Sequence, residues 1–265
     1  MPIPPDNICD YLAFLHLQHA GVSKMSSALT AIAWRHKTLN LLDPTKDHNI
    51  KRMMVTYQRN APAVKRAAPL SLSLLTLCLD KIDLLLLSAY DSTLLKAILL
   101  LCYYGCTRIG ELCLSNNLEN VLKAKCVEFV KNKQENHFQF TLLKYKLSKG
   151  PKTLAFKEHR TAKYCPVEAL RSYAAIRPIC GETFFAKPDG SPVPRAFVAS
   201  ALGKLTALAG LDKAKYSTHS IRAGRATDLA EAGVAEPVIR ATGRWSSDAY
   251  KCYLRFELLP PPASL

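Results

Sequence analysis

The chain has 265 residues and a formal net charge of +15, with 36 lysines and arginines against 21 aspartates and glutamates. Hydrophobic residues make up 49% of it, which is enough to build a core and argues against a disordered chain. The basic excess favours a polyanionic partner, and nucleic acid more than an anionic membrane, although a basic soluble protein without such a partner would have a similar composition.

The nine cysteines include no Cys-x-x-Cys pair and no matching histidine spacing, so a zinc site is not expected. Cys78, Cys102 and Cys106 fall in apolar helical stretches, where we expect them to pack in the core. The odd number of cysteines without a secretory leader predicts a reducing, intracellular setting. The leucine-rich stretch 84–104 is interrupted by charged residues, so it predicts core helices and no membrane span.

Residues 1–66 are expected to form a small helical domain. Helices are predicted at residues 8–19, 23–40 and 49–60. Trp34 stands beside basic residues, so it could stack on a ligand or pack in the core. Prolines, small residues and two basic side chains make residues 62–69 typical of a linker, which leaves 67–265 as a second domain.

The second domain is predicted to be mainly helical with a small antiparallel β-hairpin, an α+β fold. Residues 138–142 alternate apolar and polar side chains as a strand does, and residues 153–156 follow a Ser-Lys-Gly-Pro turn. Lys149 is thereby placed at the hairpin tip, from which an ammonium group could reach into a site. Helices are predicted at residues 72–82, 93–104, 166–177 and 195–210, with a turn at 188–190.

The last fifty residues hold the densest group of chemically useful side chains. His219 and Arg222 are three residues apart, so on a helix they share one face. Trp245 and Tyr253 come after Gly243, which predicts a break between short helices.

A further candidate, Arg108, lies where an apolar helical stretch ends. Glu111 follows one turn later, where it could orient the guanidinium group rather than act chemically itself. Arginine binds phosphate oxygens through a rigid fork, and tyrosine can act as a covalent nucleophile. The combined set therefore suits a phosphodiester substrate.

The candidates in chain order are Arg108, Lys149, His219-x-x-Arg222, Trp245 and Tyr253. This order resembles that of the tyrosine recombinase (phage integrase) family, whose catalytic set runs Arg, Lys, His-x-x-Arg, His or Trp, Tyr. The resemblance covers at least residues 69–256. Its segments Gly-Arg-Trp-Ser-Ser-Asp-Ala-Tyr-x-x-Tyr-Leu-Arg and Cys-Pro-Val-Glu-Ala-Leu (165–170) are most similar to recombinases of eukaryotic mobile elements, the DIRS-like and Crypton groups.

The resemblance implies a tyrosine recombinase catalytic fold over residues 67–265, preceded by a small helical core-binding domain over residues 1–66. The two would clamp double-stranded DNA. Tyr253 would attack a DNA phosphate to form a 3′-phosphotyrosine and release a 5′-hydroxyl, with no metal, ATP or other cofactor. We expect a protein that is monomeric in solution and assembles as four protomers on DNA, with no membrane partner. If the protein is eukaryotic, we expect it in the nucleus.

The resemblance also implies a role for each of the other side chains. Arg108 and Arg222 would neutralise the non-bridging oxygens of the transition state. His219 would serve as general base or proton relay. Lys149 would protonate the leaving 5′-oxygen, and Trp245, which has only its indole N–H to donate, would support the geometry.

Two assignments and the function itself leave alternatives. Lys146 is the rival of Lys149 near the same hairpin, and Tyr250 is the rival of Tyr253 one turn earlier. The closest enzymatic alternative is a type IB topoisomerase, against which His219 argues, since topoisomerases tend to have lysine there. The other is a recombinase-derived DNA-binding protein that no longer cuts.

Overall fold

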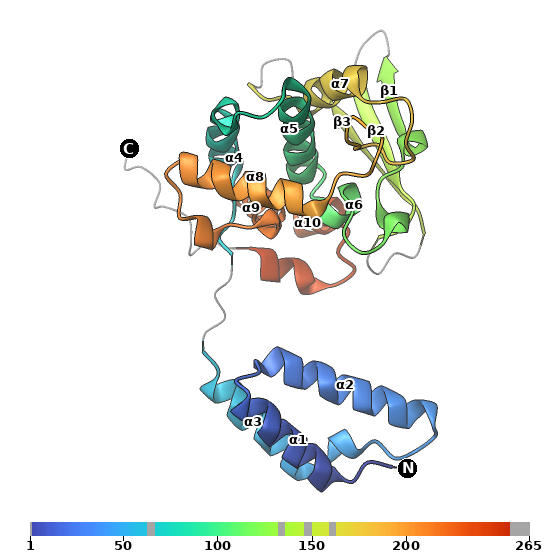
Figure 1. Ribbon diagram of the computed structural model, residues 1–265, viewed down its shortest axis with the longest axis vertical. Coiled ribbons are helices and arrows are strands. Elements are labelled where there is room, and N and C mark those ends of the chain that lie inside the picture. Colours follow the sequence, from blue (N-terminus) through green and yellow to red (C-terminus); the bar gives the residue numbers. More distant parts are fainter. Residues whose placement is uncertain (1, 63–66, 132–135, 146–149, 159–162, 255–265) are drawn as a thin grey trace. The chain divides into compact units, whose positions relative to one another are not determined.

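The structure, a computed structural model, describes residues 2–62, 67–131, 136–145, 150–158 and 163–254 (Figure 1). The chain divides into two compact units, residues 1–65 and 66–265, which we call the first and second unit. Each has a hydrophobic core of its own. Among the described residues, no helix has both the length and the apolar character needed to cross a membrane.

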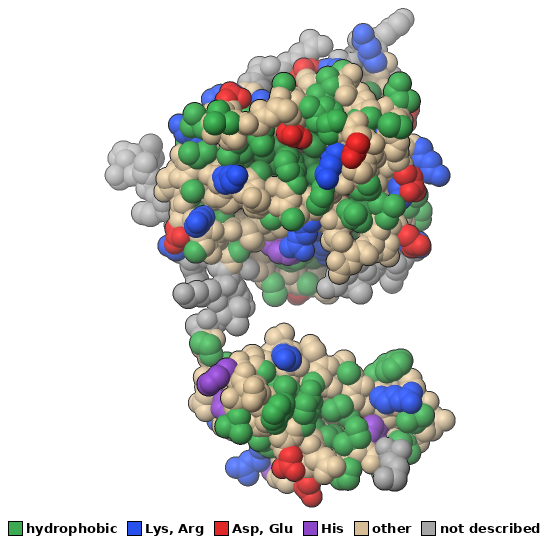
Figure 2. All heavy atoms as spheres, viewed as in Figure 1, with side chains coloured by type: hydrophobic (Ala, Val, Ile, Leu, Met, Phe, Trp, Pro, Cys, Tyr) green, Lys and Arg blue, Asp and Glu red, His purple; other side chains and the backbone are tan. Residues whose placement is uncertain are grey.

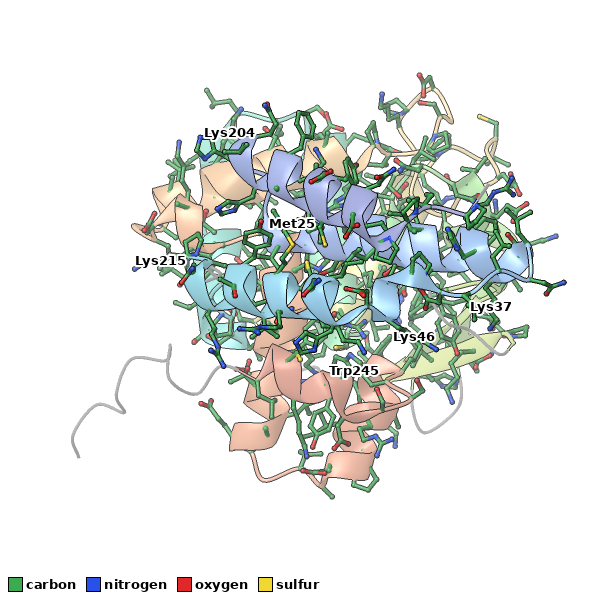
Figure 3. All side chains as sticks on the ribbon, turned by 90° about the horizontal axis from the view of Figure 1, so that it is seen from below. Met25, Lys37, Lys46, Lys204, Lys215 and Trp245 are labelled. Atoms are coloured by element: carbon green, nitrogen blue, oxygen red, sulfur yellow. The ribbon has the colours of Figure 1, made fainter. Side chains whose placement is uncertain are left out.

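The first unit is built from three helices. They are α1 (Pro5–Leu17), α2 (Val22–Thr38) and α3 (His48–Asn60), so the three predicted helices are confirmed with small shifts at their ends. Their shared core includes Ile8, Leu12 and Met25, and Figure 3 shows Met25 among the helices. Trp34 is 64% exposed on α2, so the alternative that it packs in the core is wrong.

The second unit is mainly helical. Its helices are α4 (Leu72–Leu79), α5 (Ala89–Tyr104), α6 (Ile109–Leu112), α7 (Pro166–Ile176), α8 (Arg195–Leu208), α9 (Thr218–Glu231) and α10 (Glu236–Gly243). A six-residue 3₁₀ helix, η6 (Asp248–Tyr253), follows. The central helix α5 packs against α7 and α9 and is buried along most of its length, as the leucine-rich stretch predicted. Cys78, Cys102 and Cys106 are buried, which confirms their packing role.

One face of the second unit carries a three-stranded antiparallel sheet in the order β1–β2–β3. The strands are β1 (Val127–Lys131), β2 (Asn136–Leu142) and β3 (Lys152–Lys157). Phe138 and Phe140 on β2 are fully buried, because alternate side chains of a strand point to one face. The predicted hairpin is β2–β3, and β1 extends it. Lys149 and its rival Lys146 lie outside the described residues.

Helix α9 is fixed to the start of the second unit by backbone contacts. The Leu70 N–H donates to the carbonyl oxygen of Ser220 at 2.8 Å. The Asp228 carboxylate accepts the Leu72 N–H at 2.7 Å and the Tyr103 hydroxyl. Gly224 makes this approach possible, because a Cβ atom there would lie 1.8 Å from the carbonyl oxygen of Leu70.

We therefore expect Gly224→Ala to destabilise the second unit by about 2 kcal/mol or more, because backbone atoms must move to admit the methyl group. Gly203→Ala on α8 is the matched control: no atom lies within 4 Å of its new Cβ, so it should stabilise by roughly 0.5–1 kcal/mol. Urea unfolding followed by Trp245 fluorescence, with Trp34→Phe in every protein, isolates the second unit. Equal midpoints for the two glycine variants would contradict this packing.

Candidate active site

The start of α9 presents two of the predicted side chains. Ser217 caps this helix: its hydroxyl accepts the His219 N–H at 3.2 Å, and the Ser220 hydroxyl accepts the Ser217 N–H at 3.0 Å. Side-chain caps of this kind satisfy N–H groups that a helix start leaves unpaired. His219 and Arg222 therefore occupy one helix, as predicted, with His219 exposed and Arg222 only 1% exposed.

The Arg222 guanidinium joins three segments of the chain. Its Nη1 donates to the carbonyl oxygen of Cys106 before α6, and its Nη2 donates to that of Gly243 at the end of α10, at 2.6 Å. The Trp245 ring centroid lies 4.4 Å from the guanidinium carbon, and the Tyr253 centroid lies 5.3 Å from it. These cation–π contacts place the predicted nucleophile directly beside Arg222, the side chain that was predicted to bind phosphate.

Arg108 is held by Glu111, as the sequence predicted. Arg108 is the N-cap residue of α6; its backbone N–H donates to Glu111 Oε2 at 3.0 Å, and its Nη1 lies 3.0 Å from Glu111 Oε1. The Glu111 side chain is 4% exposed and that of Arg108 is 23% exposed. The carboxylate therefore fixes a guanidinium group that still reaches solvent.

His219 lies in a positive field. Partial burial of the imidazole, together with the charges of Arg195, Arg108 and Arg222, lowers the pKa of His219 below its ordinary value of 6.5. Its neutral form, which can accept a proton, is thereby favoured. Arg195, at the start of α8, is a cation near the site that sequence reasoning did not identify.

A turn separates α10 from η6 directly after Gly243. Gly243 is the last residue of the helix, and the left-handed conformation falls on Arg244, with φ of 57°. The predicted break between short helices at Gly243 is therefore confirmed. Gly243 is also needed for space, because a Cβ atom there would lie 1.8 Å from the ring of Trp245.

The two candidate tyrosines differ in environment, although both belong to η6. Tyr250 is 1% exposed, and a hydrogen bond with the Glu236 carboxylate, with burial as a second cause, raises its pKa to about 12. Tyr253 is half-buried, with its ring centroid 5.2 Å from that of Trp245. Tyr253 is thus the more accessible of the two and the one beside Arg222.

The structure brings together five of the six predicted site residues, Arg108, His219, Arg222, Trp245 and Tyr253, whereas Lys149 is outside the described residues. Figure 3 shows Trp245 among the C-terminal helical segments. Arg244 was missed: its Nη2 lies 2.6 Å from Glu111 Oε2, and its side chain is 2% exposed. The sequence feature that could have identified Arg244 is its position between Gly243 and Trp245 in the motif given above. Within the described ranges, no three histidine, cysteine or acidic side chains are grouped to hold a metal ion.

We expect Glu111→Gln to destabilise the second unit by about 3 kcal/mol, because it leaves two arginines facing a neutral amide in a buried place. Glu119→Gln is the control: Glu119 also pairs with a cation, Lys144 at 2.6 Å, but its side chain is 65% exposed. That variant should unfold at the same midpoint as the parent, because an exposed ion pair contributes little to stability. Urea unfolding followed by Trp245 fluorescence measures both variants. An unfolding midpoint of Glu111→Gln close to that of the parent would show that the carboxylate does not stabilise the two arginines.

No family model matches the chain, and no curated protein matches it. Solved structures do match. The XerH site-specific recombinase bound to difH substrate aligns with a TM-score of 0.54 and 16% identity, over 80% of this chain and 64% of that one. The XerA recombinase aligns with a TM-score of 0.53 and 20% identity, over 96% of this chain and 78% of its own. The Tn1549 transposon integrase in complex with circular intermediate DNA aligns with a TM-score of 0.60 and 14% identity, over 97% of this chain and 83% of its own.

This chain thus spans slightly less than two thirds of the XerH recombinase. At these identities the likeness concerns the fold. It extends over both units, since nearly the whole chain aligns with the XerA recombinase and the Tn1549 integrase. The protein therefore has the fold that the resemblance to tyrosine recombinases implied, a mainly helical catalytic fold with a small antiparallel sheet, preceded by a small helical unit.

Proposed function

We propose that the protein is a site-specific recombinase that cuts and rejoins double-stranded DNA through a covalent 3′-phosphotyrosine at Tyr253. One observation carries the proposal: the Tyr253 ring lies 5.3 Å from the buried Arg222 guanidinium. A potential nucleophile and a phosphate-binding group thus meet where Arg108 and His219 also converge. The DNA-bound recombinase and integrase of the same fold support it.

In the proposed reaction, the Tyr253 oxygen forms a bond to phosphorus while the bond from phosphorus to the 5′-oxygen breaks. His219, kept neutral by its surroundings, takes the phenolic proton. Lys149 is the proposed donor of the proton that the leaving 5′-oxygen needs. Reversal of these steps rejoins the strand, and because the phosphodiester energy is kept in the phosphotyrosine, no ATP is required.

Arg108 and Arg222 would bind the non-bridging oxygens. A guanidinium group has five N–H donors. Arg222 donates one N–H from each terminal nitrogen to a backbone carbonyl oxygen. Arg108 donates one side-chain N–H to the Glu111 carboxylate. Both therefore keep donors for a phosphate. The Trp245 Nε1 is buried without a partner among the described residues, so its N–H is a further donor for the same group.

The surrounding charge is consistent with a long polyanion. Figure 2 shows lysine and arginine side chains distributed over the visible face of the second unit rather than gathered in one patch. In our proposal the first unit is the core-binding domain, and exposed Trp34 on α2, next to exposed Arg35, is its candidate DNA contact. Exchange between two duplexes requires four active sites, so four protomers would assemble on DNA.

The proposed biological setting is a eukaryotic mobile element of the DIRS-like or Crypton kind, with integration in the nucleus. It rests on the segment from Gly243 to Arg255 and on residues 165–170. The net charge of +15 is compatible with a DNA-bound protein.

The decisive experiment is adduct formation on nicked suicide duplexes that the protein itself selects from a random-sequence pool. With EDTA present, the parent protein should form a covalent adduct, because side chains supply the charges at the phosphate. Tyr253→Phe should form none yet bind DNA nearly as well, since it loses one oxygen and little volume. Tyr250→Phe, the matched control, should keep the reaction.

Other outcomes identify the alternatives. DNA binding without any adduct from the parent protein would favour the non-cutting DNA-binding protein. Relaxation of supercoiled plasmid by monomers, with no strand exchange, would favour a topoisomerase. An adduct with Tyr253→Phe but not with Tyr250→Phe would identify Tyr250 as the nucleophile. A chemical step that requires magnesium would indicate a metal nuclease.

The lowered pKa of His219 gives a prediction for the pH dependence of cleavage. A general base must be neutral, so activity falls when pH drops below its pKa in the free enzyme, which the second-order rate constant reports. Because that pKa lies below 6.5, the acidic limb should lie below pH 6.5. His219→Gln should lower the rate and remove this limb. A midpoint above 6.5, or an unchanged limb in the variant, would exclude His219 as the base.

A further inference from the structure

We infer that Arg244 is a positioning residue, which holds the Glu111 carboxylate and through it the Arg108 guanidinium. The inference rests on the proposed function, because Arg108 matters only if a phosphate is bound there. The Arg244 side chain is buried beside the site. In this inference it does not contact the DNA and acts through its neighbours.

The first observation is that one carboxylate serves two arginines. Glu111 Oε2 lies 2.6 Å from Arg244 Nη2 and accepts the Arg108 backbone N–H at 3.0 Å, while Oε1 lies 3.0 Å from Arg108 Nη1. Arg244 Nη1 also donates to the carbonyl oxygen of Gly105 at 3.1 Å. The carboxylate that orients Arg108 is thus itself held by a second arginine.

The second observation is that Arg244 contacts the supports of other site residues. The carbonyl oxygen of Cys106, which accepts from Arg222 Nη1, also lies 3.5 Å from Arg244 Nη2. The Arg244 guanidinium carbon lies 5.6 Å from the ring centroid of Tyr145. Tyr145 directly precedes the segment that contains Lys146 and Lys149 in the sequence. Arg244 therefore contacts a carbonyl group that also supports Arg222, and a tyrosine that comes shortly before the candidate lysines in the sequence.

The third observation is the backbone of Arg244. Its φ of 57° lies in the left-handed region, which favours glycine. Residues other than glycine persist there where the surrounding structure compensates, often at functional sites. Trp245 follows directly, so the same turn positions the indole ring against Arg222.

A purely structural ion pair would show the same contacts, so the test must separate stability from positioning. A structural role predicts a lower midpoint of unfolding but a normal chemical step in the folded, DNA-saturated protein. A positioning role predicts a slower chemical step under those conditions with DNA affinity preserved. Lysine at residue 244 keeps the charge but loses the planar fork that serves both Glu111 and Gly105.

The experiment measures the single-turnover rate of adduct formation at saturating suicide DNA, well below the unfolding temperature. We expect Arg244→Lys to be slower by about 100-fold, the scale of a small misplacement of reacting groups, with Kd for DNA within about twofold. Arg240→Lys is the matched control, because Arg240 is an arginine of α10, four residues before Arg244, with a 38% exposed side chain. It should keep the parent rate.

Arg244→Gly isolates the guanidinium from the backbone, since glycine accepts the left-handed conformation. Its rate should be low and should rise on addition of methylguanidinium, which can occupy the vacated place beside Glu111. In the Glu111→Gln background, Arg244→Lys should cause little further loss, because both substitutions act through one carboxylate.

A readout without catalysis separates this inference from the proposed function. In ¹⁵N spectra of the DNA-free protein, the Arg108 guanidinium protons should exchange with water faster in Arg244→Lys than in the parent, with Arg240→Lys unchanged. If the parent forms no adduct, the proposed function fails while the exchange data still decide the positioning. A parent-like cleavage rate in Arg244→Lys, additive losses with Glu111→Gln, or unchanged Arg108 exchange would overturn the inference.

Discussion

The buried Arg222 guanidinium is the interaction on which the rest of the site depends. A buried charge is costly unless it is hydrogen-bonded, so its partners must be held in place. Here they are backbone carbonyl oxygens of Cys106 and Gly243, which lie 116 and 21 residues away along the chain. Arg222 thereby draws the turn before α6 and the end of α10 onto α9. The ring of Trp245 covers the guanidinium from another side, and that ring in turn requires the small residue at Gly243.

The balance of charge around this group is compatible with the proposed chemistry. One buried carboxylate, Glu111, pairs with Arg108 and Arg244 and lies near Arg222 as a third arginine, so the described part of the site keeps an excess of positive charge. Such an excess suits a phosphodiester, whose negative charge grows as the reaction proceeds. It also lowers the pKa of His219, after the larger effect of burial. A single carboxylate is enough to orient two arginines without neutralising the site.

Sequence reasoning succeeded where the relevant contact is local. Arg108 and Glu111 are one turn apart, so their pairing follows from helix geometry, and the alternation of β2 follows from the strand period. It failed where the contact joins distant segments. The role of Arg244 depends on Glu111, 133 residues earlier, and the need for Gly224 depends on Leu70. The left-handed conformation of Arg244 was not predicted either, because its neighbour Gly243 has the higher intrinsic preference for that conformation.

The choice between Tyr250 and Tyr253 shows what three-dimensional packing adds to a motif. Residues three apart on a 3₁₀ helix lie in line on one face, so both tyrosines of η6 approach Trp245, with ring centroids 6.2 and 5.2 Å away. Tyr250 is buried and bonded to Glu236, which keeps its phenol protonated. Such a side chain anchors the helix but is a poor nucleophile. By fixing η6 against the core, Tyr250 leaves Tyr253 half-buried beside Arg222, in the position that the proposed nucleophile requires.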